Sequence, residues 1–166
     1  VGLFDGPGTG SSGKTNIPRI VDQANNIDIH FLGVEDIHPD VLSQFDLLIF
    51  PGGSGSKQAN ALGDERREFV RHFVKDRGGY VGVCAGAYLC SAHYSWSLNL
   101  VDSHVFTGSR EIEGIGRKQM WYRGETTRIE IELSEAGQQI FVAKSKTFGV
   151  AIPARAHCRL GLDSWA

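Results

Sequence analysis

The sequence is short of cysteine, of long apolar runs and of excess charge of either sign, and each shortage narrows the function. Among 166 residues there are three cysteines, Cys84, Cys90 and Cys158, and their spacing fits neither a disulfide framework nor a zinc site. We therefore expect a reducing compartment, the cytoplasm. No apolar run is long enough to span a bilayer, and no signal peptide is visible. A net charge of −2 favours neither nucleic acid nor an anionic membrane as a partner, so we expect a small-molecule substrate or ligand.

What is present is typical of one globular domain. Hydrophobic residues make up 41% of the chain and charged residues 22%, and the length is sufficient to bury a core. Internal repeats and low-complexity tracts are absent, so we predict a single domain over residues 1–166, with no cofactor and no metal. Val1 already lies in a strand-like pattern, from which we expect that an upstream segment is missing. The sequence leaves the oligomeric state open.

Strand-like and helix-like segments alternate through Cys90. This alternation predicts an α/β fold, a doubly wound, mostly parallel sheet flanked by helices, of the flavodoxin-like type. The predicted strands are Val1–Asp5, Ile27–Val34, Asp46–Phe50 and Tyr80–Val83, and the predicted helices are Ile17–Ala24, Asp36–Phe45 and Ala61–Lys75. The part after Leu89 is predicted to be strand-rich, with strands at His104–Thr107, Lys118–Tyr122, Arg128–Leu133, Gln138–Phe141 and Lys146–Ile152.

A cysteine flanked by glycines follows the fourth predicted strand. Gly82 and Gly86 stand two residues before and two residues after Cys84, which is the pattern of the G-x-S-x-G nucleophile elbow with cysteine in place of serine. Small residues at these positions let a strand turn sharply into a helix, and a thiol at a helix N-terminus is favoured as thiolate. Cys84 is therefore our candidate nucleophile. The alternative is that Cys84 is a small buried hydrophobic residue.

The loop after the first predicted strand matches a different motif. Residues Gly8–Thr15 satisfy G-x-x-x-x-G-K-S/T, the phosphate-binding P-loop. A P-loop enzyme also needs an acidic residue at the end of a later strand to hold magnesium, but the strand ending at Phe50 is followed by Pro51-Gly52-Gly53. Pro18, in addition, suits only the first turn of a helix. Nucleotide binding is kept as an alternative, beside a glycine-rich turn that caps a helix.

Three segments together resemble a known family. They are the Gly6-Pro7-Gly8-Thr9 loop, the Pro51-Gly52-Gly53 turn and the Cys84-Ala85-Gly86-Ala87-Tyr88 elbow. Over residues 1 to about 149 the chain resembles class I glutamine amidotransferase-like domains, in particular the N-terminal domain of biotin–protein ligases and its stand-alone bacterial relatives.

The resemblance implies roles for the two glycine-containing turns. The amides of Gly53 and Ala85 would form an oxyanion hole, with Gly52 and Gly86 in the same turns, and Gly8 and Thr9 would border the substrate.

A thiol nucleophile also needs a base, usually histidine. The P-x-H-P-E pattern of active class I glutamine amidotransferases is absent here, and two other histidines are candidates: His157 by its late place in the chain, and His104 soon after the elbow. The tail from about Val150 does not resemble the family. A one-base shift in a suitable choice of codons would read Arg-Tyr-Pro-His-Gly-Pro there, so we hypothesise a slipped reading frame.

The sequence thus leaves three functions open. The first is acyl transfer or amide hydrolysis at Cys84. The second is a non-catalytic binding or regulatory domain related to the one found beside biotin–protein ligase modules. The third is nucleotide binding through Gly8–Thr15. Biotin ligation itself is not expected, because no GRGRxG-like biotinyl-adenylate loop occurs.

Overall fold

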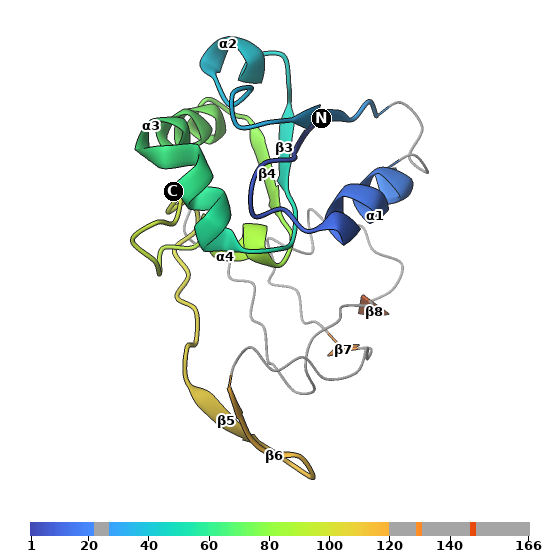
Figure 1. Ribbon diagram of the computed structural model, residues 1–166, viewed down its shortest axis with the longest axis vertical. Helices are drawn as coiled ribbons and strands as arrows, with labels where there is room; N and C mark the ends of the chain where they lie inside the picture. The colour runs from blue at the N-terminus through green and yellow to red at the C-terminus, as the bar shows by residue number, and fades with distance from the viewer. Residues whose placement is uncertain (22–26, 120–128, 131–146, 149–166) are drawn as a thin grey trace. The chain divides into compact units, whose positions relative to one another are not determined.

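The computed structural model describes residues 1–21, 27–119, 129–130 and 147–148 of the chain (Figure 1). The chain divides into two compact units, Val1–Val105 and Phe106–Ala166, and each is treated by itself below. The prediction of a single domain over the whole chain stays a prediction.

The first unit is built on a four-stranded parallel sheet. Its strands lie in the order β2-β1-β3-β4, so the chain runs outward from β1 in one direction and from β3 in the other. The predicted mostly parallel α/β sheet is thus confirmed. The bounds are β1 Gly2–Phe4, β2 His30–Leu32, β3 Leu47–Phe50 and β4 Gly79–Gly82.

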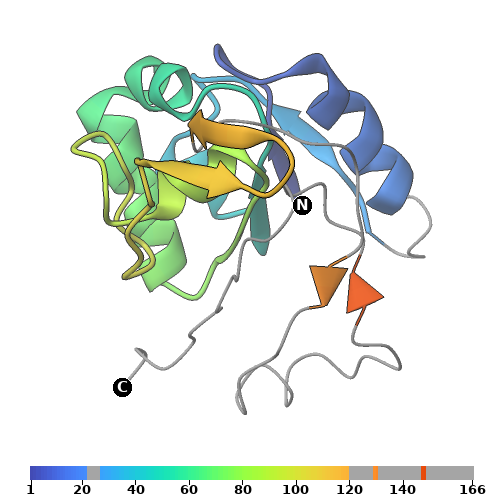
Figure 2. The same ribbon diagram turned by 90° about the horizontal axis from the view of Figure 1, so that it is seen from below.

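Helices flank this sheet on both faces. Helix α1 lies on one face, and α3 and α4 lie on the other (Figures 1 and 2). The helices of this unit span Ser11–Val21 (α1), Pro39–Leu42 (α2), Gly55–Lys75 (α3) and Ala85–Cys90 (α4). Parallel strands must be joined by such crossover connections, which bring the carboxyl end of every strand to the same edge of the sheet.

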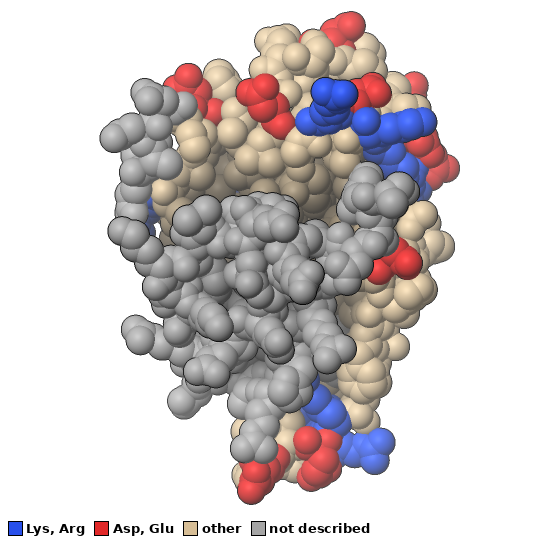
Figure 3. Space-filling model, turned by 180° about the vertical axis from the view of Figure 1, so that it is seen from behind, with Lys and Arg blue, Asp and Glu red and all other residues tan. Residues whose placement is uncertain are grey.

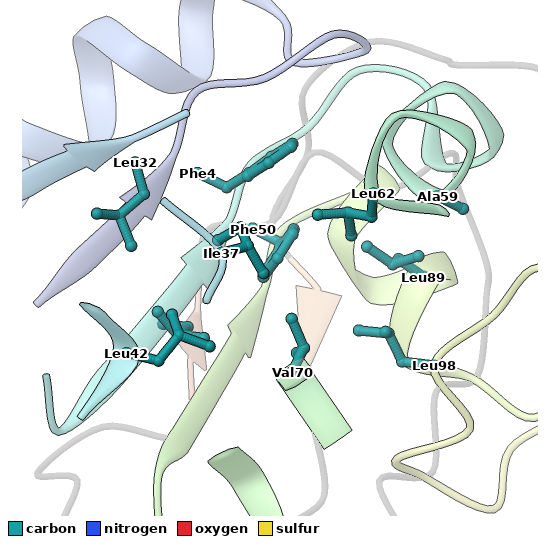
Figure 4. Close-up of a cluster of buried hydrophobic side chains, with 11 residues drawn as sticks. Phe4, Leu32, Ile37, Leu42, Phe50, Ala59, Leu62, Val70, Leu89 and Leu98 are labelled. Carbon is teal, nitrogen blue, oxygen red and sulfur yellow. The ribbon is translucent and has the colours of Figure 1, made fainter. Parts of the chain in front are cut away.

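The main core lies between the sheet and the helices α2, α3 and α4. Phe50 is at its centre, fully buried, with its ring stacked between Phe4 at 4.9 Å and Tyr80 at 5.3 Å between ring centroids. Side chains from α3, from α4 and from the loop that follows α4 converge on this stack (Figure 4). They are Ala59, Leu62, Val70, Leu89 and Leu98.

All three predicted helices differ from their predicted bounds, and α2 covers only Pro39–Leu42 of the predicted Asp36–Phe45. Helix α3 begins at Gly55, six residues before the predicted start at Ala61, because the Ser54 side chain caps it by accepting a hydrogen bond from the N–H of Lys57. Gly63 interrupts this helix with φ 65° and ψ −178°. Helix α1 begins at Ser11 and runs through Pro18, against the expectation that Pro18 would be confined to a first turn. No residue of α1 is buried, so water can satisfy the carbonyl that the proline ring leaves without a partner.

The predicted strand at His104–Thr107 was wrong, because these residues form no strand. The second unit instead pairs β5, Ser109–Ile112, with β6, Gly116–Gln119, as an antiparallel hairpin. Its turn depends on Gly114 at φ 75° and Gly116 at φ 84°, conformations that side chains disfavour. Strands β7, Ile129–Glu130, and β8, Thr147–Phe148, form a separate antiparallel pair. The strand predicted at Gln138–Phe141 lies outside the described residues.

The described residues carry charges of both signs and no long apolar helix. On the face drawn in Figure 3, basic and acidic side chains are interspersed among other residues. Among the described residues, no helix is long and apolar enough to cross a membrane.

The Phe4–Phe50–Tyr80 stack gives the first prediction. We expect Phe50→Ala to lower the free energy of unfolding by about 3 to 5 kcal/mol, because it removes the ring on which the sheet and helices pack. The matched control is Phe31→Ala on the edge strand β2, where the side chain is 52% exposed and the expected loss is below about 1 kcal/mol. Urea titration followed by intrinsic fluorescence measures both. Equal losses would contradict this account of the core.

Candidate active site at the carboxyl edge of the sheet

Three loops meet where the parallel strands end. The Gly6–Gly10 loop follows β1, the Pro51–Ser54 turn follows β3, and Cys84 follows β4. The connections from β1 and β3 lead to opposite sides of the sheet, so the boundary between these two strands is the topological switch point. Open parallel sheets bind their ligands at this place.

Cys84 lies in a strained turn between β4 and α4. Its φ is 52° and its ψ is −101°, a combination that L-residues with side chains rarely adopt, and its side chain is exposed. The chain continues at once into α4, since the carbonyl of Cys84 accepts hydrogen bonds from the N–H groups of Ala87 and Tyr88. The turn predicted from the glycine pattern is therefore present, and the alternative of a buried Cys84 is wrong.

The two flanking glycines make this turn sterically feasible. A Cβ placed on Gly86 would lie 2.1 Å from the carbonyl oxygen of Phe50, and one placed on Gly82 would lie 2.5 Å from the carbonyl carbon of Gly86. Real Cβ atoms do not approach so closely. Only glycine at both positions lets α4 pack directly on the ends of β3 and β4.

The loops after β1 and β3 are joined by backbone hydrogen bonds. The N–H of Gly10 donates to the carbonyl of Gly52 at 2.8 Å, and the N–H of Ser54 donates to the carbonyl of Gly8 at 2.8 Å. These two bonds enclose an antiparallel pair of residues, Thr9 and Gly53. In such a pair the N–H and C=O of the enclosed residues point away from the opposite strand. The N–H of Gly53 therefore faces away from the Gly6–Gly10 loop.

Gly52 brings this turn up to the thiol. A Cβ placed on Gly52 would lie 3.3 Å from Cβ and 3.9 Å from Sγ of Cys84. The predicted site residues of the turns and the elbow thus assemble at one edge of one unit. They are Gly8, Thr9, Gly52, Gly53, Cys84, Ala85 and Gly86.

The P-loop-like segment is used differently from a phosphate cradle. The N–H groups of Thr9, Gly10 and Gly13 donate to the carbonyls of Gly6, Gly52 and Gly10, whereas a phosphate-binding loop keeps such groups for its ligand. Lys14 forms an ion pair with Asp5. Three N–H groups of this segment are therefore used within the protein, and nucleotide binding through Gly8–Thr15 stays a prediction.

The structure describes one of the two candidate bases. His157 lies outside the described residues. His104 is exposed in the stretch after Val101, and its ring lies 5.9 Å from that of His93, centroid to centroid.

His93 belongs to none of the motifs in the sequence. Its ring packs edge-on against Tyr94 at 4.5 Å, and Tyr94 stacks on Trp96 at 4.4 Å. A Cβ placed on Gly55 would lie 3.1 Å from the Trp96 ring and 3.1 Å from the carbonyl oxygen of Ala85, so this aromatic group reaches the elbow. The sequence signal for this aromatic group is the alternation of polar and aromatic residues in 93–96.

Two further titratable groups lie near the elbow. The Tyr80 hydroxyl donates to the carbonyl of Gly86 at 2.9 Å, and burial, followed by the nearby Cys90, raises the pKa of Tyr80 well above its ordinary value. Burial also raises the pKa of the Cys90 thiol, whose S–H donates to the carbonyl of Ala87. Both groups therefore stay protonated at neutral pH. In the described part of the chain, no group of three or more His, Cys, Asp or Glu side chains could hold a metal.

Comparison with known proteins gives one family and one relative. Residues 25–124, more than half of the chain, match the family described as biotin-protein ligase, N terminal. An uncharacterized protein of Chlamydia muridarum (strain MoPn / Nigg) is 36% identical over 50 residues. That segment covers 30% of this chain and 19% of the relative.

The strained turn gives a second prediction. Because glycine tolerates φ 52° and other residues do not, we expect Cys84→Gly to be more stable than Cys84→Ala by about 1 kcal/mol. The control is Ala87→Gly at an exposed position of α4, which should lose about 1 kcal/mol. Thermal unfolding of the three variants measures these differences. A Cys84→Gly variant less stable than Cys84→Ala would remove the evidence for strain.

Proposed function

The chain belongs to the family of biotin-protein ligase N-terminal domains, and we propose that it is a cysteine-dependent acyl transferase or amide hydrolase of the class I glutamine amidotransferase-like type. Cys84 is the proposed nucleophile, and a small amide or acyl compound is the proposed substrate. The observation that carries the proposal is the backbone strain at an exposed cysteine, with φ 52° in a turn that ends beside Gly52. Strain of this kind is concentrated at functional sites.

The backbone around Cys84 supports an oxyanion hole. The N–H of Gly53 faces away from the Gly6–Gly10 loop and follows Gly52, the residue that borders Cys84. The N–H of Ala85 belongs to the residue directly after the nucleophile, which is the usual second donor in an elbow. Two such donors would stabilise the negative oxygen of a tetrahedral intermediate.

The reaction then follows from these groups. The Cys84 thiolate attacks the carbonyl carbon, a C–S bond forms, and the carbonyl electron pair moves to the oxygen held by Gly53 and Ala85. Collapse of this intermediate breaks the bond to the leaving group, which takes a proton from a general acid. Water or another acceptor attacks the thioester and returns Cys84 to its thiol form.

The general base is proposed to be a histidine. His104 is the candidate in the described part of the chain, and we propose that His93, whose ring centroid lies 5.9 Å from that of His104, orients it or shares its proton. His157 remains the second candidate.

A second function is favoured by the family itself. The matched family is named for the N-terminal part of biotin-protein ligases, and such a domain could act as a binding or regulatory module. In that case the elbow would bind a ligand without catalysing a reaction on it. The two proposals differ in one observable, the formation of a covalent acyl group on Cys84.

The third prediction tests that difference. With 4-nitrophenyl acetate near neutral pH, we expect acetyl transfer to Cys84 with release of 4-nitrophenolate, at least about 100-fold faster than transfer to glutathione, because a free thiol has no oxyanion hole. Mass spectrometry locates the acetyl group. Cys84→Ala should abolish the fast phase, and Cys90→Ala should retain it, since the raised pKa of Cys90 keeps that thiol protonated.

Alkylation supplies the control for this assay. Iodoacetamide reacts with a thiolate by displacement at an sp³ carbon and needs no oxyanion hole, so its rate reports exposure and ionisation only. We expect the ratio of acylation to alkylation to be far higher for Cys84 than for glutathione. Equal ratios would reject the enzyme and leave the binding module.

The fourth prediction concerns the base. We expect His104→Ala to slow hydrolysis of the acetylated Cys84 by about 100-fold, the usual contribution of a general base. The control is His72→Ala, at an exposed histidine of α3. If His104→Ala hydrolyses at the wild-type rate and His157→Ala does not, the base is His157.

A further inference from the structure

Gln58 is a buried polar side chain near the Pro51–Ser54 turn, and only one of its two polar atoms has a hydrogen-bond partner among the described residues. It lies in the first part of α3 and is fully buried, on the inward face of the helix that also carries Leu62. Its Nε2 donates to the carbonyl of Pro51 at 3.0 Å. Its Oε1 has no hydrogen-bond partner among the described residues. Since a carbonyl can only accept, the Nε2 must be the atom that faces Pro51.

The cost of this arrangement argues for a purpose. A buried amide with an unpaired oxygen destabilises the fold, whereas an apolar side chain of the same length would pack there without that penalty. What the amide supplies and an apolar side chain cannot is a donor to the Pro51 carbonyl.

That carbonyl belongs to the first residue of the Pro51–Ser54 turn, which is called the oxyanion turn below because its Gly53 N–H is a proposed oxyanion donor. Three consecutive carbonyls at the end of β3 each accept a hydrogen bond from a different element. Phe50 accepts from the N–H of Val83 at 2.9 Å, and Gly52 accepts from the N–H of Gly10 at 2.8 Å. Between them, Pro51 accepts from Gln58, and this bond alone of the three comes from a side chain. These bonds hold the backbone up to Gly52, and the N–H of Ser54, which donates to the carbonyl of Gly8, holds it on the other side of Gly53.

We infer that Gln58 is a positioning residue for the oxyanion turn: by holding the Pro51 carbonyl it orients the N–H of Gly53 toward the acyl oxygen of the substrate. This inference rests on the proposed function. Gln58 acts through the backbone of Pro51–Gly53 and touches no reacting atom. Oxyanion stabilisation depends on donors fixed before the reaction, and small displacements weaken it strongly.

The test separates oxyanion stabilisation from thiol reactivity in one sample. Gln58→Met keeps the length of the side chain and removes the donor. We expect acetylation of Cys84 by 4-nitrophenyl acetate to slow by at least about tenfold, and alkylation of the same thiol by iodoacetamide to stay within about twofold of wild type. The matched control is Gln44→Met, because Gln44 is an exposed glutamine whose Nε2 donates to the carbonyl of Asp40 at 3.3 Å. It should leave both rates unchanged.

A second variant covers the case in which Gln58→Met does not fold. In Gln58→Glu the protonated carboxyl can donate to the Pro51 carbonyl and the carboxylate cannot. Relative to alkylation, acetylation should therefore approach the wild-type value at low pH and fall as the pH rises.

The outcomes are distinguishable. If wild-type Cys84 is not acetylated faster than glutathione, the proposed function fails, and this inference falls with it. If wild type is acetylated rapidly and the Gln58 variants change acetylation and alkylation in equal proportion, or change neither, the proposed function stands and Gln58 has only a structural role.

Discussion

The approach of α4 to the end of β3 is the constraint on which the rest of the site depends. Gly86 lies so close to the carbonyl of Phe50 that a Cβ would collide with it at 2.1 Å. This contact fixes the first turn of α4, and the chain must then cross from β4 to α4 within the two residues Val83 and Cys84. Cys84 takes the strain of that crossing as φ 52°. An exposed thiol at the sheet edge is thus a consequence of backbone packing, and the core around Phe50 supplies the rigidity that maintains it.

Much of the fold could be predicted from the sequence because its signals are local. The apolar run at residues 47–50 and the glycines at 82 and 86 specify a buried strand and a tight turn without reference to the rest of the chain. The failures came where competing local signals had to be compared. Ser54 caps α3 well before the apolar periodicity becomes clear, and residues 104–107 have strand-like composition but no strand to pair with.

The site likewise contains residues that the sequence predicts and residues that it does not. The two turns could be found by their glycines, since positive φ and close backbone approach leave a mark in the sequence. Gln58 leaves a fainter mark, a polar residue one helical turn before Leu62 on the inward face of α3. Its partner, the Pro51 carbonyl, is a backbone group, and no pattern of side chains encodes it. The contact between His93 and His104 likewise arises only when the chain after α4 folds back on itself.

The Lys14–Asp5 ion pair shows why a motif must be judged by what its atoms bind. The segment from Gly8 to Thr15 satisfies the spacing of a P-loop, but the N–H groups of Thr9, Gly10 and Gly13 donate to carbonyls of the protein. The bond from Gly10 to Gly52, together with the bond from Ser54 to Gly8, places Thr9 opposite Gly53, in the turn whose Gly52 borders Cys84. Glycines of the kind that let a loop surround a phosphate let this loop pair with a second loop. In the proposed function this use of the loop would serve the thiol, because a turn held on both sides can present its remaining N–H group without rearrangement when charge develops on the substrate.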